Sequence, residues 1–160
     1  SFAVIYDPNG GFVTGGGWFT SAPGSYPANP PATGKANFGF VSKYQSGKNA
    51  TNVPTGETEF QFKDGDLNFH SSTYDGGSLV ISGYKATYRG TGTVNGTGSY
   101  KFLVVAYDGD RPGGGGVDRF RIKITNGTTT VYDNRMGVSE DIDNADPTAI
   151  GGGSIVIHKN

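Results

Sequence analysis

The sequence predicts an all-β protein: an antiparallel β-sandwich of about ten short strands, with a flattened β-barrel as the alternative. Three Asx-Gly pairs, at 64–65, 95–96 and 126–127, each separate two runs in which apolar and polar residues alternate. Asp or Asn followed by Gly tolerates the positive φ values of a type I′ turn, so each pair predicts a two-residue β-hairpin. The 28 glycines and 8 prolines favour short strands joined by many turns. Ten strands are too many for one flat sheet, and no window shows the 3.6-residue period of an amphipathic helix.

The chain is expected to contain an N-terminal strand and tether, 1–8, followed by a single sandwich domain, 9–160. The apolar run 2–6 indicates a strand, and the turn-forming residues 7–11 end it. Further strands are expected at 12–20, 35–44 and 154–158, with loops at 21–34 and 45–56.

The first hairpin is expected to pair 57–63 with 66–72. A two-residue turn at 64–65 sets the opposed pairs of this hairpin, which are Phe62 with Leu67, Phe60 with Phe69, and Glu59 with His70. The aromatic pairs then form one apolar face, and the charged pair lies on the other.

The second and third hairpins follow the same logic. A turn at 95–96 pairs 84–94 with 97–107 and sets Tyr84, Ala86 and Tyr88 opposite Tyr107, Val105 and Leu103. A turn at 126–127 pairs 117–125 with 128–133, with Phe120, Ile122 and Ile124 pointing inward and Arg119, Arg121 and Lys123 pointing outward.

Charge and composition exclude several functions. The net charge of −1 and the pI near 6.0 provide no basic field for binding nucleic acid or an anionic membrane. The absence of Cys removes disulfides, thiolate nucleophiles and Cys-ligated zinc. No apolar run of about 18 residues is present, so the sequence predicts a soluble chain without a membrane span.

Two groups of acidic residues are candidates for binding calcium. Asp108, Asp110 and Asp118 flank a glycine-rich loop, and Asp141 and Asp143 lie in a second acidic stretch. Calcium takes six to eight oxygen ligands from carboxylates and loop carbonyls, which both segments offer. The second stretch does not match the EF-hand loop. Solvated acids in ordinary turns are the alternative interpretation.

Catalytic candidates are few, and we expect no enzyme. His70 opposite Glu59 resembles a general base with an orienting carboxylate, but no neighbouring nucleophile accompanies it, and an exposed cross-strand pair is the ordinary explanation. Glu57 and Glu59 share one strand face at a separation of about 7 Å, as a glycosidase pair would, yet charges on an edge strand often do so.

Two binding modes are compatible with the sequence. The aromatic residues in polar, glycine-rich surroundings are candidate platforms for sugar rings, with burial in the core as the alternative; they are Trp18, Tyr26, Tyr44, Tyr74 and Tyr88. The tethered apolar strand Phe2-Ala3-Val4-Ile5-Tyr6 is a candidate for strand addition to a neighbouring domain or an identical subunit, with pairing in its own sheet as the alternative.

Four stretches together resemble a known bacterial module. They are Tyr6-Asp7-Pro8 with Gly11 to Trp18, Gly34 to Tyr44, Asp118 to Ile124, and Gly151 to His158. They are similar to the β-rich C-terminal module that follows PKD-type or HYR-type Ig-like domains in secreted bacterial multidomain proteins. The resemblance spans nearly the whole chain. It implies a non-catalytic, extracellular or cell-surface role in adhesion, matrix or polysaccharide contact, with Phe2–Tyr6 equivalent to the last strand of the preceding domain. It carries over no catalytic or ligand residue.

Overall fold

The all-β prediction is confirmed by the computed structural model, which describes residues 11–44 and 52–158. The eleven strands are β1 (Phe12–Ser21), β2 (Gly34–Lys43), β3 (Thr58–Phe62), β4 (Leu67–Tyr74), β5 (Val80–Ser82), β6 (Lys85–Val94), β7 (Thr97–Tyr107), β8 (Arg119–Asn126), β9 (Thr129–Asp133), β10 (Thr148–Ala149) and β11 (Gly152–His158). All of the strand pairs are antiparallel. The predicted strand and tether at 1–8 lie outside the described residues.

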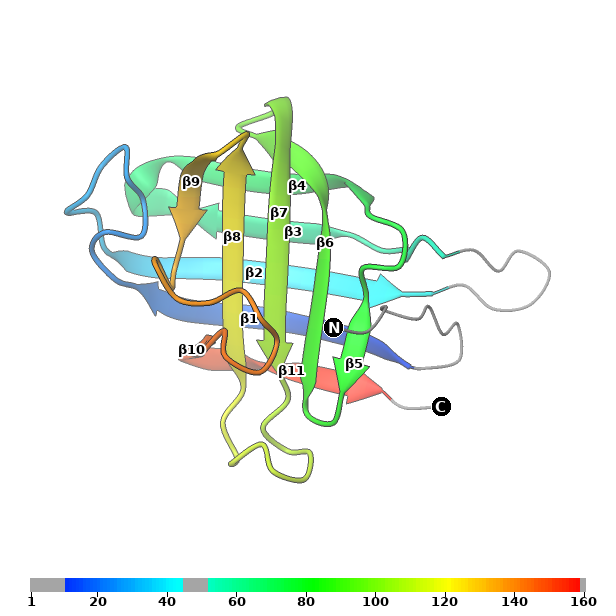
Figure 1. Cartoon of the computed structure of the whole chain (residues 1–160). Coiled ribbons are helices and arrows are strands. Elements are labelled where there is room, and N and C mark those ends of the chain that lie inside the picture. Colours follow the sequence, from blue (N-terminus) through cyan, green and yellow to red (C-terminus); the bar gives the residue numbers. More distant parts are fainter. Residues whose placement is uncertain (1–10, 45–51, 159–160) are drawn as a thin grey trace.

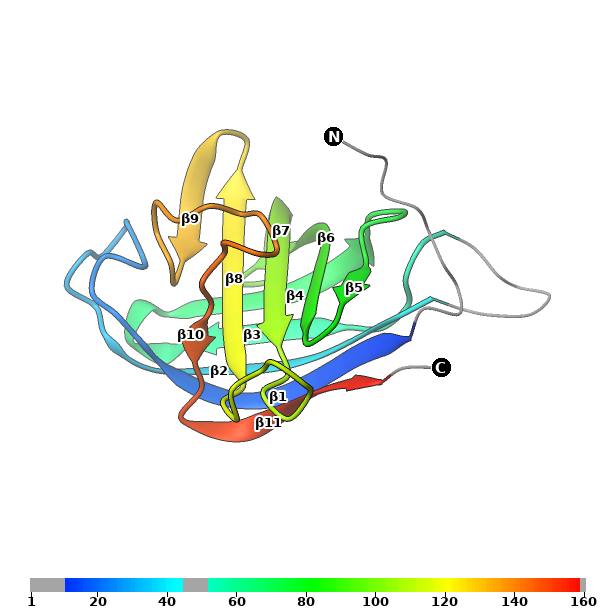
Figure 2. The ribbon, with the colours of Figure 1, turned by 60° about the horizontal axis from the view of Figure 1, so that its bottom comes forward.

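The strands form one continuous sheet that folds back on itself. Its order is β10-β8-β7-β6-β4-β3-β2-β1-β11, with β5 also paired to β6 and β9 to β8. The two end strands of this order do not pair with each other, so the described sheet is an open sandwich and not a closed barrel. In Figure 1, β6, β7 and β8 cross β1 to β4 at a steep angle, and Figure 2 shows the two halves facing each other.

The sheet folds over where β4 pairs with β6. The register shifts between Ser71 and Thr73, which marks a bulge in β4. On β6, a Cβ at Gly90 would overlap the Thr73 carbonyl oxygen, and a Cβ at Gly92 would overlap that of His70. Only glycine allows these backbones to approach so closely, and aromatic rings pack over the two glycines.

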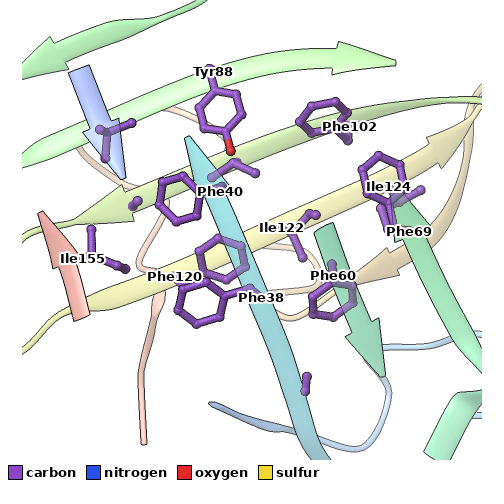
Figure 3. Close-up of a cluster of buried hydrophobic side chains, with 14 of the residues drawn as sticks. Phe38, Phe40, Phe60, Phe69, Tyr88, Phe102, Phe120, Ile122, Ile124 and Ile155 are labelled. Atoms are coloured by element: carbon purple, nitrogen blue, oxygen red, sulfur yellow. The ribbon is translucent and has the colours of Figure 1, made fainter. Parts of the chain in front are cut away.

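Aromatic rings from both halves of the sheet fill the core (Figure 3). Phe38 of β2 stacks on Phe120 of β8 with ring centroids 4.1 Å apart. The rings of Phe60 and Tyr132 follow at 4.7 Å, and these side chains are at most 6% exposed. The core is therefore continuous from one layer to the other, and the alternate residues of each strand point to the outer face of the sheet.

The first hairpin has the predicted register but a different turn. Phe62 lies opposite Leu67 and Glu59 opposite His70, as expected. The connection is a 3₁₀ turn, η2 (Lys63–Gly65), which ends at Asp66 with φ of 51°. The predicted type I′ turn is therefore wrong. The predicted pairing of β3 with β4 is right, because the four-residue connection is centred on the same point as the expected two-residue turn.

The second hairpin has the predicted turn but a shifted register. Asn95 and Gly96 have φ of 53° and 80°, as a type I′ turn requires. An extra residue in β7 at Gly98, with φ of 81°, then moves the pairing by one, so Tyr88 lies opposite Val104 and not Leu103. Alternate residues of β7 consequently exchange faces relative to the prediction.

The third hairpin turns one residue later than predicted. Asn126 still pairs with Thr129 in the ladder, so the two turn residues are Gly127 and Thr128. Gly127 has φ of 61° and Thr128 has no positive φ, which is the pattern of a type II′ turn rather than a type I′ turn.

One residue predicted to face solvent is fully buried. Arg121 does lie on the outer face of β8, but the segment 134–147 crosses this face (orange, Figure 1) and leaves its side chain 0% exposed. All five guanidinium N–H groups have partners: the two Asp133 carboxylate oxygens and the carbonyl oxygens of Val138, Ser139 and Ala145. The same segment covers a small apolar cluster formed by Leu103, Val105, Tyr107 and Ala145.

Candidate functional site

Two of the predicted calcium ligands, Asp108 and Asp118, lie in the connection between β7 and β8 and bind the backbone of β11. The Asp118 carboxylate accepts the N–H of Gly109 at 2.7 Å and that of Ile155 at 2.7 Å. The Asp108 carboxylate accepts the N–H of Asp110 at 3.0 Å and that of Ile157 at 2.8 Å. Each acid therefore replaces a missing strand partner on β11, which gives both a structural role.

The remaining predicted calcium ligands lie apart from this pair. Asp141 accepts a hydrogen bond from the Asn144 side chain at 2.8 Å, and Asp143 forms an ion pair with Lys85 at 2.9 Å. Asp110 is exposed on the loop after β7. Within residues 11–44 and 52–158, no group of three or more His, Cys, Asp or Glu side chains is arranged to hold a metal ion.

The predicted sugar platforms at Tyr44, Tyr74 and Tyr88 need correction, because all three side chains lie in the core. The hydroxyls of Tyr74 and Tyr88 lie 2.8 and 2.6 Å from Thr58 Oγ1, and Tyr74 also donates to the Val41 carbonyl. Burial raises the pKa of both phenols above its ordinary value. A buried ring cannot offer a face to a sugar, so these residues build the fold.

The other two predicted platforms are only partly accessible. The Trp18 indole packs against Gly151 and Gly152, and Lys35 Nζ lies 4.4 Å from its ring centroid. The Tyr26 ring meets Phe62 edge-on at a centroid distance of 6.4 Å. Both residues are partly exposed at the surface, without forming one platform.

The strand-addition candidates Phe2, Ala3, Val4, Ile5 and Tyr6 lie outside the described residues, so strand addition stays a prediction. Size-exclusion chromatography of the intact chain and of a chain that lacks residues 1–8 tests it. Strand exchange predicts a larger particle for the intact chain only. Two monomers of equal stability would contradict it.

An open groove of about 630 Å³ lies over the outer face of β2, β3 and β4. Inward-pointing Phe residues of these strands enter the core, so the intervening polar residues face the groove. The polar side chains that line it are Asn37, Glu59, Gln61, Asn68, His70 and Thr93.

The strand register arranges these side chains in two rows across the sheet. Three carboxamides make the first row, because Gln61 lies between Asn37 and Asn68. The second row runs from Gly39 through Glu59 and His70 to Thr93. These rows cross three strands that follow one another in the chain, and Thr93 of β6 extends the second row.

A glycine and a hairpin shape the groove. At Gly39, in the second row, an added Cβ would meet no atom within 4 Å, so the missing side chain leaves open space in the groove floor. At one end, the Asn95 side chain accepts the backbone N–H of Asn68 at 2.8 Å, which fixes the β6–β7 turn beside β4 and brings Gly96 to the groove wall.

Glu59 and His70 form the predicted cross-strand pair within this groove. Glu59 Oε1 lies 3.2 Å from His70 Nδ1, and their side chains are 68% and 51% exposed. An exposed pair of this kind contributes little to stability. The carboxylate and the imidazole are therefore available to a ligand.

The sequence alone did not identify Asn37, Gln61 and Asn68 as site residues. The one signal for them was that each is a polar residue between two apolar residues of a strand, which places it on the outer face of the sheet.

A second concavity, of about 420 Å³, lies over the outer face of β6, β7 and β8. Its cations already have anionic partners: Lys101 pairs with Asp75, and Arg89 and Lys123 both pair with Glu140. The hydrogen bond from Lys123 is the main reason why the pKa of Glu140 is lowered. The charged side chains of this surface therefore form ion pairs with one another and with Asp75, within the chain.

The part of the chain that the structure describes contains no apolar helix with the length needed to span a bilayer. Comparisons with protein-family models, with curated proteins and with solved structures each found no match.

Proposed function

We propose that the chain is a non-catalytic adhesive module of a secreted protein, and that it binds carbohydrate in the groove over β2, β3 and β4. The observation that carries this proposal is the row of three carboxamides, Asn37, Gln61 and Asn68, which lines an open groove of about 630 Å³. The adhesive and extracellular parts of the proposal rest on the resemblance described above.

Carboxamides suit a hydroxyl-rich ligand because each one both donates and accepts hydrogen bonds without carrying charge. A sugar hydroxyl does the same, so three carboxamides on adjacent strands can bind several hydroxyls of a single glycan. Neighbouring strands are about 4.8 Å apart, which spaces the row over roughly 10 Å. The open floor at Gly39 leaves room for the ring beside that row.

The groove suits binding better than catalysis. Glu59 is the only carboxylate among its lining residues, whereas glycoside hydrolysis ordinarily uses two carboxyl groups about 5–10 Å apart across the scissile bond. His70 pairs with Glu59, and the described structure has no hydrogen bond between His70 and the hydroxyl of Thr93, the hydroxyl residue of the lining, so no activated nucleophile is assembled.

A polysaccharide pull-down with variants of Gly39 tests the proposal. Gly39 lies in a strand without a positive φ, and a Cβ there meets nothing, so Gly39→Ala, Gly39→Thr and Gly39→Gln should fold normally. Their side chains fill the groove progressively, so binding should fall progressively, by more than about tenfold for Gln. Thr20→Gln, at an exposed position of β1 outside the groove lining, is the matched control and should bind as the parent does.

The pull-down is run with and without added calcium, and thermal unfolding checks each variant. No binding to any polysaccharide in either condition would refute the proposal. Binding that is unchanged in the folded Gly39→Gln variant would place the ligand elsewhere.

A further inference from the structure

The charges of the groove indicate which class of glycan it accepts, and this inference rests on the proposed function. Glu59 is the central charge, because it lies opposite Gly39 on one side and His70 on the other. The described residues that line the groove include no Lys, no Arg and no second carboxylate.

The two lysines on the outer face of β2 pack over aromatic rings and not beside Gly39. Lys35 and Lys43 share the outer face of β2 with Gly39, but each lies four residues away, or about 13 Å along the strand. Lys35 Nζ packs over the Trp18 ring and Lys43 Nζ over the Phe12 ring, at 4.4 and 4.6 Å from the centroids. Among the residues that the structure describes, the imidazole of His70 is the one group within hydrogen-bonding distance of the Glu59 carboxylate.

An exposed carboxylate treats neutral and acidic sugars differently. It accepts hydrogen bonds from hydroxyls, and such charge-assisted bonds are stronger than neutral ones. The carboxylate or sulfate of an acidic sugar would instead be repelled. At a separation of about 5 Å in water-like surroundings, this repulsion weakens binding roughly fourfold, and it grows at low permittivity and low salt.

We infer that the groove selects neutral glycans, and that Glu59 is the specificity-determining residue that excludes uronate-containing and sulfated chains. The carboxamides bind either class, whereas Glu59 discriminates between them.

The test compares polymers that share one backbone and differ at C6, where a hydroxyl is replaced by a carboxylate. Glucan, mannan and galactan are each presented to the intact chain as the neutral polymer and after oxidation of their C6 hydroxyls to carboxylates. We expect the oxidised form of the bound polymer to bind at least about fourfold more weakly at low salt. In Glu59→Gln this difference should shrink to less than about twofold, because the amide still binds hydroxyls without repelling anions.

Glu57→Gln is the matched control, since it makes the same change in charge two residues away, outside the groove lining. It should keep the discrimination of the parent chain. Equal or tighter binding of the oxidised polymer, or identical behaviour of the two Gln variants, would overturn the inference and leave the proposed function intact. Failure to bind any polymer in either form would refute both.

Discussion

The buried guanidinium of Arg121 provides a direct test of how the outer layer is held. Arg121→Met keeps much of the apolar stem but removes all five hydrogen bonds of the guanidinium. The Asp133 carboxylate, which is 1% exposed, then loses its counter-charge, and three carbonyl oxygens of the covering segment lose their donors.

Loss of one partner of a buried ion pair costs about 3–5 kcal/mol. Since a domain of this size has a total stability of about 5–15 kcal/mol, Arg121→Met should lose about a fifth or more of it. Lys123→Met is the matched control, two residues along the same face of β8. Its partly exposed pair with Glu140 should contribute less than about 1 kcal/mol.

Urea unfolding followed by Trp18 fluorescence and by far-UV circular dichroism measures both variants, and coincident transitions justify the two-state treatment. The double variant Arg121→Met with Asp133→Leu should recover part of the loss, because no unpaired charge remains buried. If Arg121→Met costs less than about 1 kcal/mol, or no more than Lys123→Met, the account of this layer is wrong.

Three further predictions concern the fold. Asp118→Asn should cost about 1–3 kcal/mol, because the carboxamide has a single acceptor oxygen and one of the two backbone N–H groups bound by the carboxylate loses its acceptor. Hydrogen exchange should accelerate at the Gly109 or the Ile155 amide, and unchanged exchange at both would contradict the role of Asp118 at β11. Gly90→Ala should destabilise the chain far more than Gly39→Ala, since only the former Cβ would overlap backbone, and equal melting temperatures would contradict the described bend. Burial raises the pKa of Tyr74 and Tyr88, so the unfolded phenols ionise near pH 10 while the folded ones stay neutral. Stability from these groups should therefore be constant below about pH 10 and fall above it, as pH-dependent urea unfolding would show; a flat profile to pH 12 would contradict this.

Local turn chemistry predicted the architecture well. The first hairpin kept its register because a four-residue 3₁₀ connection is centred on the same point as the expected two-residue turn. The register of the second hairpin shifted at Gly98, since a bulge depends on how the two strands twist within the sheet and not on the turn sequence.

Tertiary contacts explain what the sequence could not predict. The alternation along β8 placed Arg121 on the outer face correctly, but only the crossing of 134–147 buries it. The groove combines side chains of the consecutive strands β2, β3 and β4 with Thr93 of β6. The sequence predicted only the Glu59–His70 pair among them, because no turn motif specifies how β2 pairs with β3. Tyr44 and Tyr74 lie in the core although their neighbours are polar, because bonds of their hydroxyls to carbonyl oxygens satisfy the polar end of each ring.

The central claim is that a neutral glycan binds across the carboxamide row of β2, β3 and β4. Titration of ¹⁵N-labelled protein with the glycan selected by the pull-down, followed by NMR, tests this most directly through the side-chain amide signals of Asn37, Gln61 and Asn68. We expect all three signals to shift together and to saturate at one affinity. Shifts confined to the surface of Arg89, Lys101 and Lys123, with these three carboxamides unchanged, would contradict it.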